Sequence, residues 1–131
     1  MDRQALVTEM RGLRERVPGV TGALVAALDG QLVAADLGPG PDSGVDPRSL
    51  ARSAAASLGA ARQVAGLAGQ GALGRAVTRA SGGYVAVYAV GDAALLAVLG
   101  GDGLDLDELH QKARPALDQM RAILAVPKAS A

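Results

Sequence analysis

The chain has 131 residues, and its 13 basic and 13 acidic side chains give a formal net charge of zero. Only 2% of its residues are aromatic and it has no cysteine, which excludes disulfides, thiol catalysis and thiolate metal sites. The balanced charge and the scarcity of aromatic rings argue against nucleic-acid binding. We expect one domain over residues 1–126, a frayed tail over 127–131, and a core of Ala, Val and Leu.

The N-terminal segment predicts an amphipathic helix. Asp2 is a suitable N-cap, and apolar side chains follow at helical spacing with charged residues on the opposite face. Pro18 ends the helix, because it has no N–H and clashes with the preceding turn. No secretory leader or membrane span is apparent, so we expect a cytoplasmic protein. The apolar positions are Leu6, Met10, Leu13 and Val17.

The segment from Val17 to Asp36 then predicts a hairpin. Val20 to Leu28 is an apolar strand, Leu32 to Ala35 is the return strand, and Asp29-Gly30 lies between them. An Asp-Gly pair favours a two-residue type I′ turn, in which both central residues have positive φ. The next residues, Leu37 to Val45, are rich in Gly and Pro and predict a loop.

A second helix is predicted from Asp46 to about Ala65. Asp46 is the expected N-cap, and Pro47 fits the first helical position because its missing N–H costs nothing there. Alanines cover much of the remaining surface, which suits either a close helix–helix contact or simple helix propensity. The apolar stripe consists of Leu50, Ala54, Leu58, Ala61 and Val64.

Gly66 to Gly74 predicts a connector. Residues Gly69 to Gly74 match the dinucleotide pattern G-x-G-x-x-G, but a helix precedes the match and a strand follows it. The phosphate-binding fingerprint requires the reverse order, so we interpret the match as chance.

Three strands are predicted next, at Leu73–Ala80, Tyr84–Val90 and Ala93–Leu99. Gly82-Gly83 and Gly91-Asp92 are short turns, so the strands form an antiparallel meander. The last strand is apolar on both faces and should be central, whereas the strand with two arginines should be an edge. These arginines, Arg75 and Arg79, would contact an acidic partner surface or protect the edge from uncontrolled pairing.

After a loop at Gly100 to Gly103, a third helix is predicted. Asp105 and Glu108 resemble a capping box, and Pro115 should kink the helix. The apolar stripe consists of Leu106, Leu109, Ala113, Leu117, Met120 and Leu124.

Few residues in this sequence suggest catalysis or the binding of a metal or cofactor. His110 is the single histidine, and no G-x-S-x-G elbow accompanies it, so we interpret it as a solvated helix position, with a pH-responsive contact as the alternative. The acidic residues near the third helix lack calcium-loop spacing and suit a helix N-terminus. No phosphate loop is present. We therefore predict no catalytic residue, metal site or cofactor. The acidic group is Asp102, Asp105, Asp107 and Glu108.

With its pieces in this order, the chain resembles the Roadblock/dynein light chain family from Leu6 to about Leu124. The predicted fold is α+β, an α/β sandwich with α-β-β-α-β-β-β-α order and a five-stranded antiparallel sheet, similar to Roadblock domains and profilin. The residues that carry the resemblance are Val17 to Val20, Gly22 to Val25, Asp29-Gly30, Leu32-Val33, Gly83 to Tyr88 and Ala94 to Leu99.

The resemblance implies a sheet in the order second, first, fifth, fourth and third strand. It places the long second helix on one face and the two terminal helices on the other. It also implies a dimer in which second helices pack together and third strands pair into a ten-stranded sheet. The expected dimer-interface residues are Leu50, Ala54, Leu58, Ala61, Arg75, Val77 and Arg79.

For function, the resemblance implies a non-enzymatic homodimeric regulator or scaffold of a small Ras-like GTPase, either GTPase-activating or accessory. The alternative is an adaptor that joins a sensor kinase or another Roadblock subunit without a GTPase-activating role. A small-ligand sensor is a third hypothesis. The composition, which is rich in Ala, Gly and Arg, is typical of an actinobacterial source.

Overall fold

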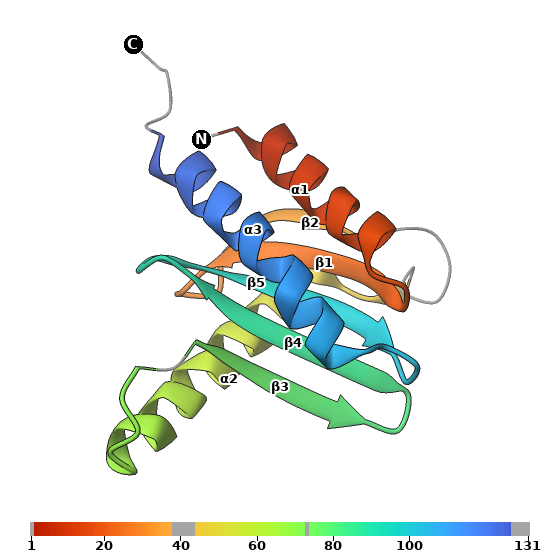
Figure 1. The fold of residues 1–131 in the computed structure, drawn as a ribbon. Coiled ribbons are helices and arrows are strands. Elements are labelled where there is room, and N and C mark those ends of the chain that lie inside the picture. The colour runs from red at the N-terminus through yellow and green to blue at the C-terminus, as the bar shows by residue number, and fades with distance from the viewer. Residues whose placement is uncertain (1, 38–43, 73, 127–131) are drawn as a thin grey trace.

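The computed structural model describes residues 2–37, 44–72 and 74–126. Eight elements follow in the predicted order, α-β-β-α-β-β-β-α (Figure 1). They are α1 (Arg3–Arg16), β1 (Val20–Ala27), β2 (Leu32–Asp36), α2 (Pro47–Leu67), β3 (Arg75–Ala80), β4 (Gly83–Val90), β5 (Ala94–Gly101) and α3 (Leu106–Ala125). Most of the predicted loop Leu37 to Val45, the predicted strand start at Leu73 and the predicted tail 127–131 lie outside the described residues.

Each helix begins at the aspartate that the sequence predicts. The carboxylate of Asp2 accepts a hydrogen bond from the backbone N–H of Ala5, Asp46 from that of Arg48, and Asp105 from that of Glu108. Such a cap satisfies one of the unpaired N–H groups of the first turn, and replacing it by alanine costs about 1 kcal/mol. A hydrogen bond from the Ser49 hydroxyl lowers the pKa of Asp46, which keeps that cap ionised.

The five strands form one antiparallel sheet in the order β2-β1-β5-β4-β3. The expected strand order is confirmed, with β5 at the centre and β3 at an edge. Six of the eight residues of β5 are buried, because helices cover both of its faces. Helices α1 and α3 cover one face of the sheet and α2 covers the other, as expected (Figure 1).

Two apolar clusters fill the spaces between these layers. The larger lies between the sheet and the terminal helices and contains Leu6, Met10 and Leu109. The smaller lies under α2 and contains Leu58, Leu24 and Leu95. Both depend on close backbone approach, since alanine supplies many of the contacts.

Three turn predictions are wrong in detail. Asp29-Gly30 is not a type I′ turn, because only Gly30 has positive φ, at 94°. The carboxylate of Asp29 accepts a hydrogen bond from Gln31, which stabilises a longer loop. Gly83 belongs to β4 and pairs with Ala80, so Ser81-Gly82 forms that turn. The third turn extends by one residue, since Val90 pairs with Ala94.

The predicted loop at Gly100 to Gly103 also begins too early. Gly100 pairs with both Val20 and Tyr84, and Gly101 pairs with Gly83, so β5 continues through both glycines. A Cβ on Gly83 would collide with the carbonyl oxygen of Gly100. Strands without side chains approach closely here, which glycine alone permits.

Candidate protein-protein interface

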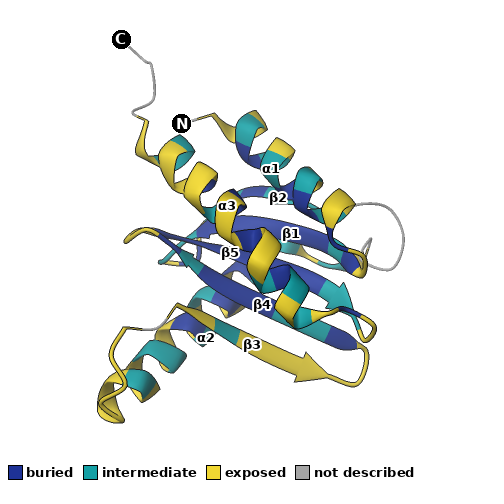
Figure 2. Cartoon of the chain, in the orientation of Figure 1, coloured by how far each residue is buried: buried dark blue, intermediate teal, exposed yellow. Residues whose placement is uncertain are grey.

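Strand β3 is the most exposed strand of the sheet. Five of its six residues are exposed and Ala76 is half-buried, whereas β1 and β5 are almost wholly buried (Figure 2). Its neighbours are β4 on one side and α2 on one face. A strand with one bare side presents unpaired backbone N–H and C=O groups, which is a template for another strand.

The register of β3 with β4 shows which backbone groups face that bare side. The carbonyl of Gly74 accepts a hydrogen bond from the N–H of Ala89, so these two residues form a hydrogen-bonded pair. Such pairs alternate along an antiparallel ladder, so Ala76 and Thr78 direct their backbone groups to β4. The backbone groups of the alternate residues of β3 point outward, away from β4. These residues are Arg75, Val77 and Arg79.

The C-terminal half of α2 forms the second part of this surface. After Leu58 no residue of the helix is buried, and its last turns extend past the β3 edge (Figure 1). Val64 is 66% exposed and Leu67 is 83% exposed. With Val77, at 40%, they are three of the four large exposed apolar side chains of the described residues. We call Val64, Leu67 and β3 together the β3–α2 edge.

The predicted interface residues divide between the core and this edge. Ala54 and Leu58 are only 4% and 1% exposed, because they pack against the chain's own sheet. We therefore leave both out of the proposed interface, because almost no surface of either side chain is left for a partner. Leu50 and Ala61 are half-buried, and the three β3 residues are exposed.

The side chains of Arg75, Val77 and Arg79 lie on the sheet face opposite α2. They pair across the ladder with Tyr88, Ala86 and Tyr84, and these three belong to the cluster under the terminal helices. The guanidinium carbon of Arg79 lies 5.8 Å from the centre of the Tyr84 ring, a cation–π contact. The arginines and the α2 stripe therefore meet only along the sheet edge.

His110 contacts the sheet beside this strip. Its Nδ1 lies 2.6 Å from the hydroxyl oxygen of Tyr88, and the two rings meet edge to face. Burial and then the charge of Arg75 lower the pKa of His110, against the opposing effect of Asp107. Burial raises the pKa of Tyr88 to about 12. The Tyr88 hydroxyl therefore stays protonated, and His110 is half-buried in contact with it rather than fully solvated.

Comparison with known proteins identifies the family to which this chain belongs. The model of the Roadblock/LC7 domain matches residues 6–100. The chain belongs to the Roadblock/LC7 domain family. A comparison with curated protein sequences gives no match.

Solved structures agree with this assignment. A Roadblock/LC7 domain from Streptomyces avermitilis is 25% identical, with a TM-score of 0.80 over 91% of this chain and 97% of that one. Myxococcus xanthus MglB is 18% identical, with a TM-score of 0.82 over 95% and 98%. Acanthamoeba castellanii profilin IA is 15% identical, with a TM-score of 0.56 over 92% and 97%. The Roadblock/profilin-like fold predicted from the sequence is confirmed.

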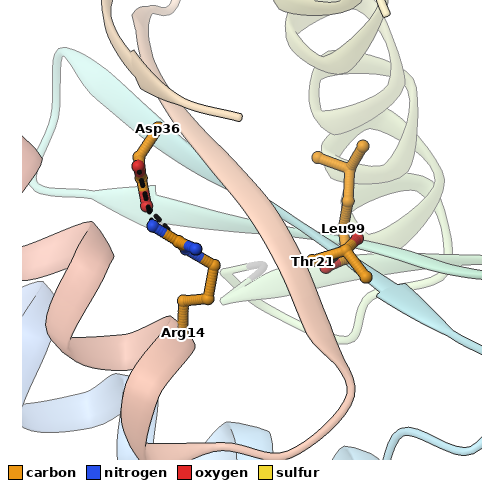
Figure 3. A network of polar contacts seen from close by, with 4 residues as sticks. All are labelled: Arg14, Thr21, Asp36 and Leu99. Atoms are coloured by element: carbon orange, nitrogen blue, oxygen red, sulfur yellow. Dashed lines mark hydrogen bonds and ion pairs between the residues drawn. The ribbon is translucent and has the colours of Figure 1, made fainter. Parts of the chain in front are cut away.

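At the opposite edge of this Roadblock domain, strand β2 lies partly under a helix. Helix α1 packs against β2 and β1, and the guanidinium of Arg14 binds the carboxylate of Asp36 at the end of β2 (Figure 3). The two atom pairs, Nε–Oδ2 and Nη2–Oδ1, are 3.0 and 3.3 Å apart. The Asp36 side chain is 10% exposed, which strengthens the pair relative to one in water.

Sequence reasoning missed both the Arg14–Asp36 pair and the Tyr88–His110 contact. Each joins residues 22 positions apart, and only the sheet order brings them together. The alternation of β4 offered one signal: Tyr88 shares a face with buried Ala86 and Val90, so its hydroxyl needed a partner.

The described residues of this Roadblock domain contain no cluster of three or more histidines or acidic side chains that could hold a metal. Among the acidic residues singled out from the sequence, Asp105 is occupied as the cap of α3. No helix within residues 2–37, 44–72 and 74–126 is both long and apolar enough to span a membrane.

Proposed function

We propose that this Roadblock/LC7 domain is a non-enzymatic, homodimeric regulator or scaffold of a small Ras-like GTPase. The β3–α2 edge is the observation that carries this proposal. It combines an unburied apolar helix end with a strand whose outward backbone groups have no partner among the described residues. The chain belongs to the Roadblock/LC7 family, and the resemblance to this family implies a role with such GTPases. The role is GTPase-activating or accessory.

In the proposed dimer, two copies of β3 pair antiparallel about a two-fold axis normal to the sheet. This symmetry keeps both copies of α2 on one face and extends the five strands to ten. The outward backbone groups of Arg75, Val77 and Arg79 supply the hydrogen bonds. Leu50, Ala61, Val64 and Leu67 supply apolar contact between the helices, and a contact between identical surfaces closes the assembly.

A dimer of this kind would act on a GTPase by positioning rather than by chemistry. Acceleration of GTP hydrolysis requires that the attacking water and the switch segments are held in place and that the charge on the transferred phosphoryl is stabilised. The broad surface across two paired domains can order switch segments, whereas no arginine of this chain is assigned as an inserted finger.

The test uses the small Ras-like GTPases encoded by the source genome, beginning with any encoded next to this chain. Each GTPase, loaded with GTP, is mixed with the immobilised domain and, separately, followed in single-turnover hydrolysis. We expect one GTPase to bind in its GTP form. A rate increase would mark an activator, and binding at an unchanged rate an accessory subunit. Neither binding nor a rate change with any of them would reject the proposal.

The same edge favours a second candidate function, an adaptor that recruits a sensor kinase or another Roadblock subunit. An open strand can pair with a strand of a different chain as readily as with its own copy. Native mass spectrometry after co-expression with neighbouring Roadblock proteins distinguishes the two. Exclusive heterodimers would favour the adaptor, and homodimers that capture a GTPase would favour the regulator.

A further inference from the structure

The face of β3 opposite α2 carries two arginines with no ion-pair partner among the described residues. Arg75 and Arg79 are exposed, and the ion pair of Arg14 with Asp36 is the only one within residues 2–37, 44–72 and 74–126. Val77 lies between them on the same face. Helix α3 packs on β4 but leaves β3 uncovered, so this Arg-Val-Arg strip is open to solvent (Figure 2).

Pairing of two β3 strands would bring both strips together. A two-fold axis normal to the sheet keeps each strip on the same face and pairs odd-numbered residues with odd-numbered ones. In the register centred on Val77, Arg75 of each copy lies opposite Arg79 of the other, about 5.5 Å apart at the Cα atoms. In the register centred on Thr78, all four arginines still share one face of the seam.

Like charges directly opposite each other on one sheet face are destabilising. The arrangement therefore opposes the dimer unless an anion lies between the guanidinium groups. Arginine is well suited to hold carboxylates, because its planar fork donates two parallel hydrogen bonds. The two copies of Val77 form an apolar floor between the charges, a feature that suits a peptide rather than a free ion.

We propose that the two-fold seam of the dimer is a binding site for an acidic segment of a partner protein, formed by Arg75 and Arg79 of both copies. This inference rests on the strand-paired dimer proposed above. The site is incomplete in one copy, since each supplies half of the arginines. Asp102 lines the hollow beside Arg79, and Asp107 lies near His110. These carboxylates flank the strip, and their charge would repel an acidic segment that extended past it.

A ligand that binds only the dimer must tighten dimerisation by mass action. The experiment measures the dimer dissociation constant by sedimentation velocity at fixed ionic strength. The probes are a short peptide of alternating glutamate and serine, and the matched peptide of glutamine and serine. We expect the acidic peptide to lower the dissociation constant about tenfold or more and the neutral peptide to leave it unchanged.

Two double variants distinguish a specific binding site from general screening of charge. Arg75→Gln with Arg79→Gln should dimerise more tightly than the wild type without peptide and lose the response to it. Arg3→Gln with Arg11→Gln, which removes two exposed arginines of α1, should respond as the wild type does. An equal response of both double variants, or an equal effect of sodium chloride at matched ionic strength, would overturn the proposal.

Three further outcomes each reject a particular claim. A wild type that is monomeric at every salt and peptide concentration would reject the strand-paired dimer itself. A wild type that dimerises without responding to the peptide would reject the acidic-segment site alone. Binding to phosphatidylserine vesicles with no peptide response would assign the strip to a membrane surface and likewise overturn the proposal.

Discussion

The two edges of this sheet differ in the contacts that their strands make with the rest of the domain. At the β2 edge, α1 packs against the strand and the Arg14–Asp36 pair fixes the strand end. At the β3 edge, the strand is exposed, its arginines have no carboxylate partner among the described residues, and the nearest helix end presents bare apolar side chains. An edge that is a liability in a monomer is retained here, which is typical of a surface that another strand covers.

Proline at the β3 edge should give the largest effect. Val77→Pro removes an N–H that points away from β4, so the monomer keeps its ladder while the proposed seam loses a hydrogen bond twice. We expect dimerisation to weaken roughly a hundredfold or more, as measured by light scattering across a concentration series.

Val77→Thr is the matched control for this prediction, because it keeps the backbone donor and a β-branched side chain. Its dimer should resemble that of the wild type. A Val77→Pro domain that stays dimeric would remove β3 from the interface, provided that circular dichroism shows it folded.

The apolar end of α2 should give the next largest effect. Val64→Gln with Leu67→Gln removes side chains that are exposed in one copy and buried only in the proposed dimer. We expect the dissociation constant to rise about tenfold or more, with unchanged thermal stability of the monomer. Ala122→Gln, at an exposed position of α3, should leave both quantities unchanged.

A substitution at the β2 edge should lower the stability of the domain and leave dimerisation unchanged. Asp36→Asn removes the charge that Arg14 binds at a side chain only 10% exposed. We expect the free energy of unfolding to fall by about 1–2 kcal/mol in urea titrations, with no change in dimerisation. Asp92→Asn, at an exposed turn, is the control. A dimer weakened by Asp36→Asn would mean that the two edges are not independent.

The smallest effect should be the pH response of His110. Its pKa is lowered in the folded state, so the unfolded chain binds a proton first as pH falls below about 6.5. Stability should therefore be full at higher pH and decrease on acidification through that range. The urea midpoint of the wild type should fall between pH 7.5 and 5.5, and His110→Gln should reduce the decrease. Equal decreases in both proteins would assign the pH dependence to other groups.

Local signals predicted much of this fold. Three aspartate caps, the apolar stripes of α1 and α3, and the Arg-bearing edge strand all follow from side-chain chemistry within a few residues. The turns were less predictable, because the hairpin at Gly83 depends on its close approach to Gly100 from a third segment. Such contacts exist only once the strand order is known.

The candidate site was predictable only in part. The exposure of Val77 and both arginines follows from the edge position. The burial of Ala54 and Leu58 against the chain's own sheet does not, because a helical stripe does not reveal what it packs against. The long helix has one apolar stripe in sequence and two environments in space: its first half covers the sheet and its second half projects beyond it. Periodicity alone does not distinguish these.

The central claim is that the outward backbone groups of β3 are hydrogen-bonded in a dimer. Amide hydrogen exchange by NMR, above and below the dimer dissociation constant, tests it residue by residue. We expect the amides of Arg75, Val77 and Arg79 to exchange slowly only at high concentration, whereas those of Ala76 and Thr78, bonded to β4, should be slow at both. Equally fast exchange of the three outward amides at both concentrations, in a protein that is dimeric at the higher one, would contradict the strand-paired dimer.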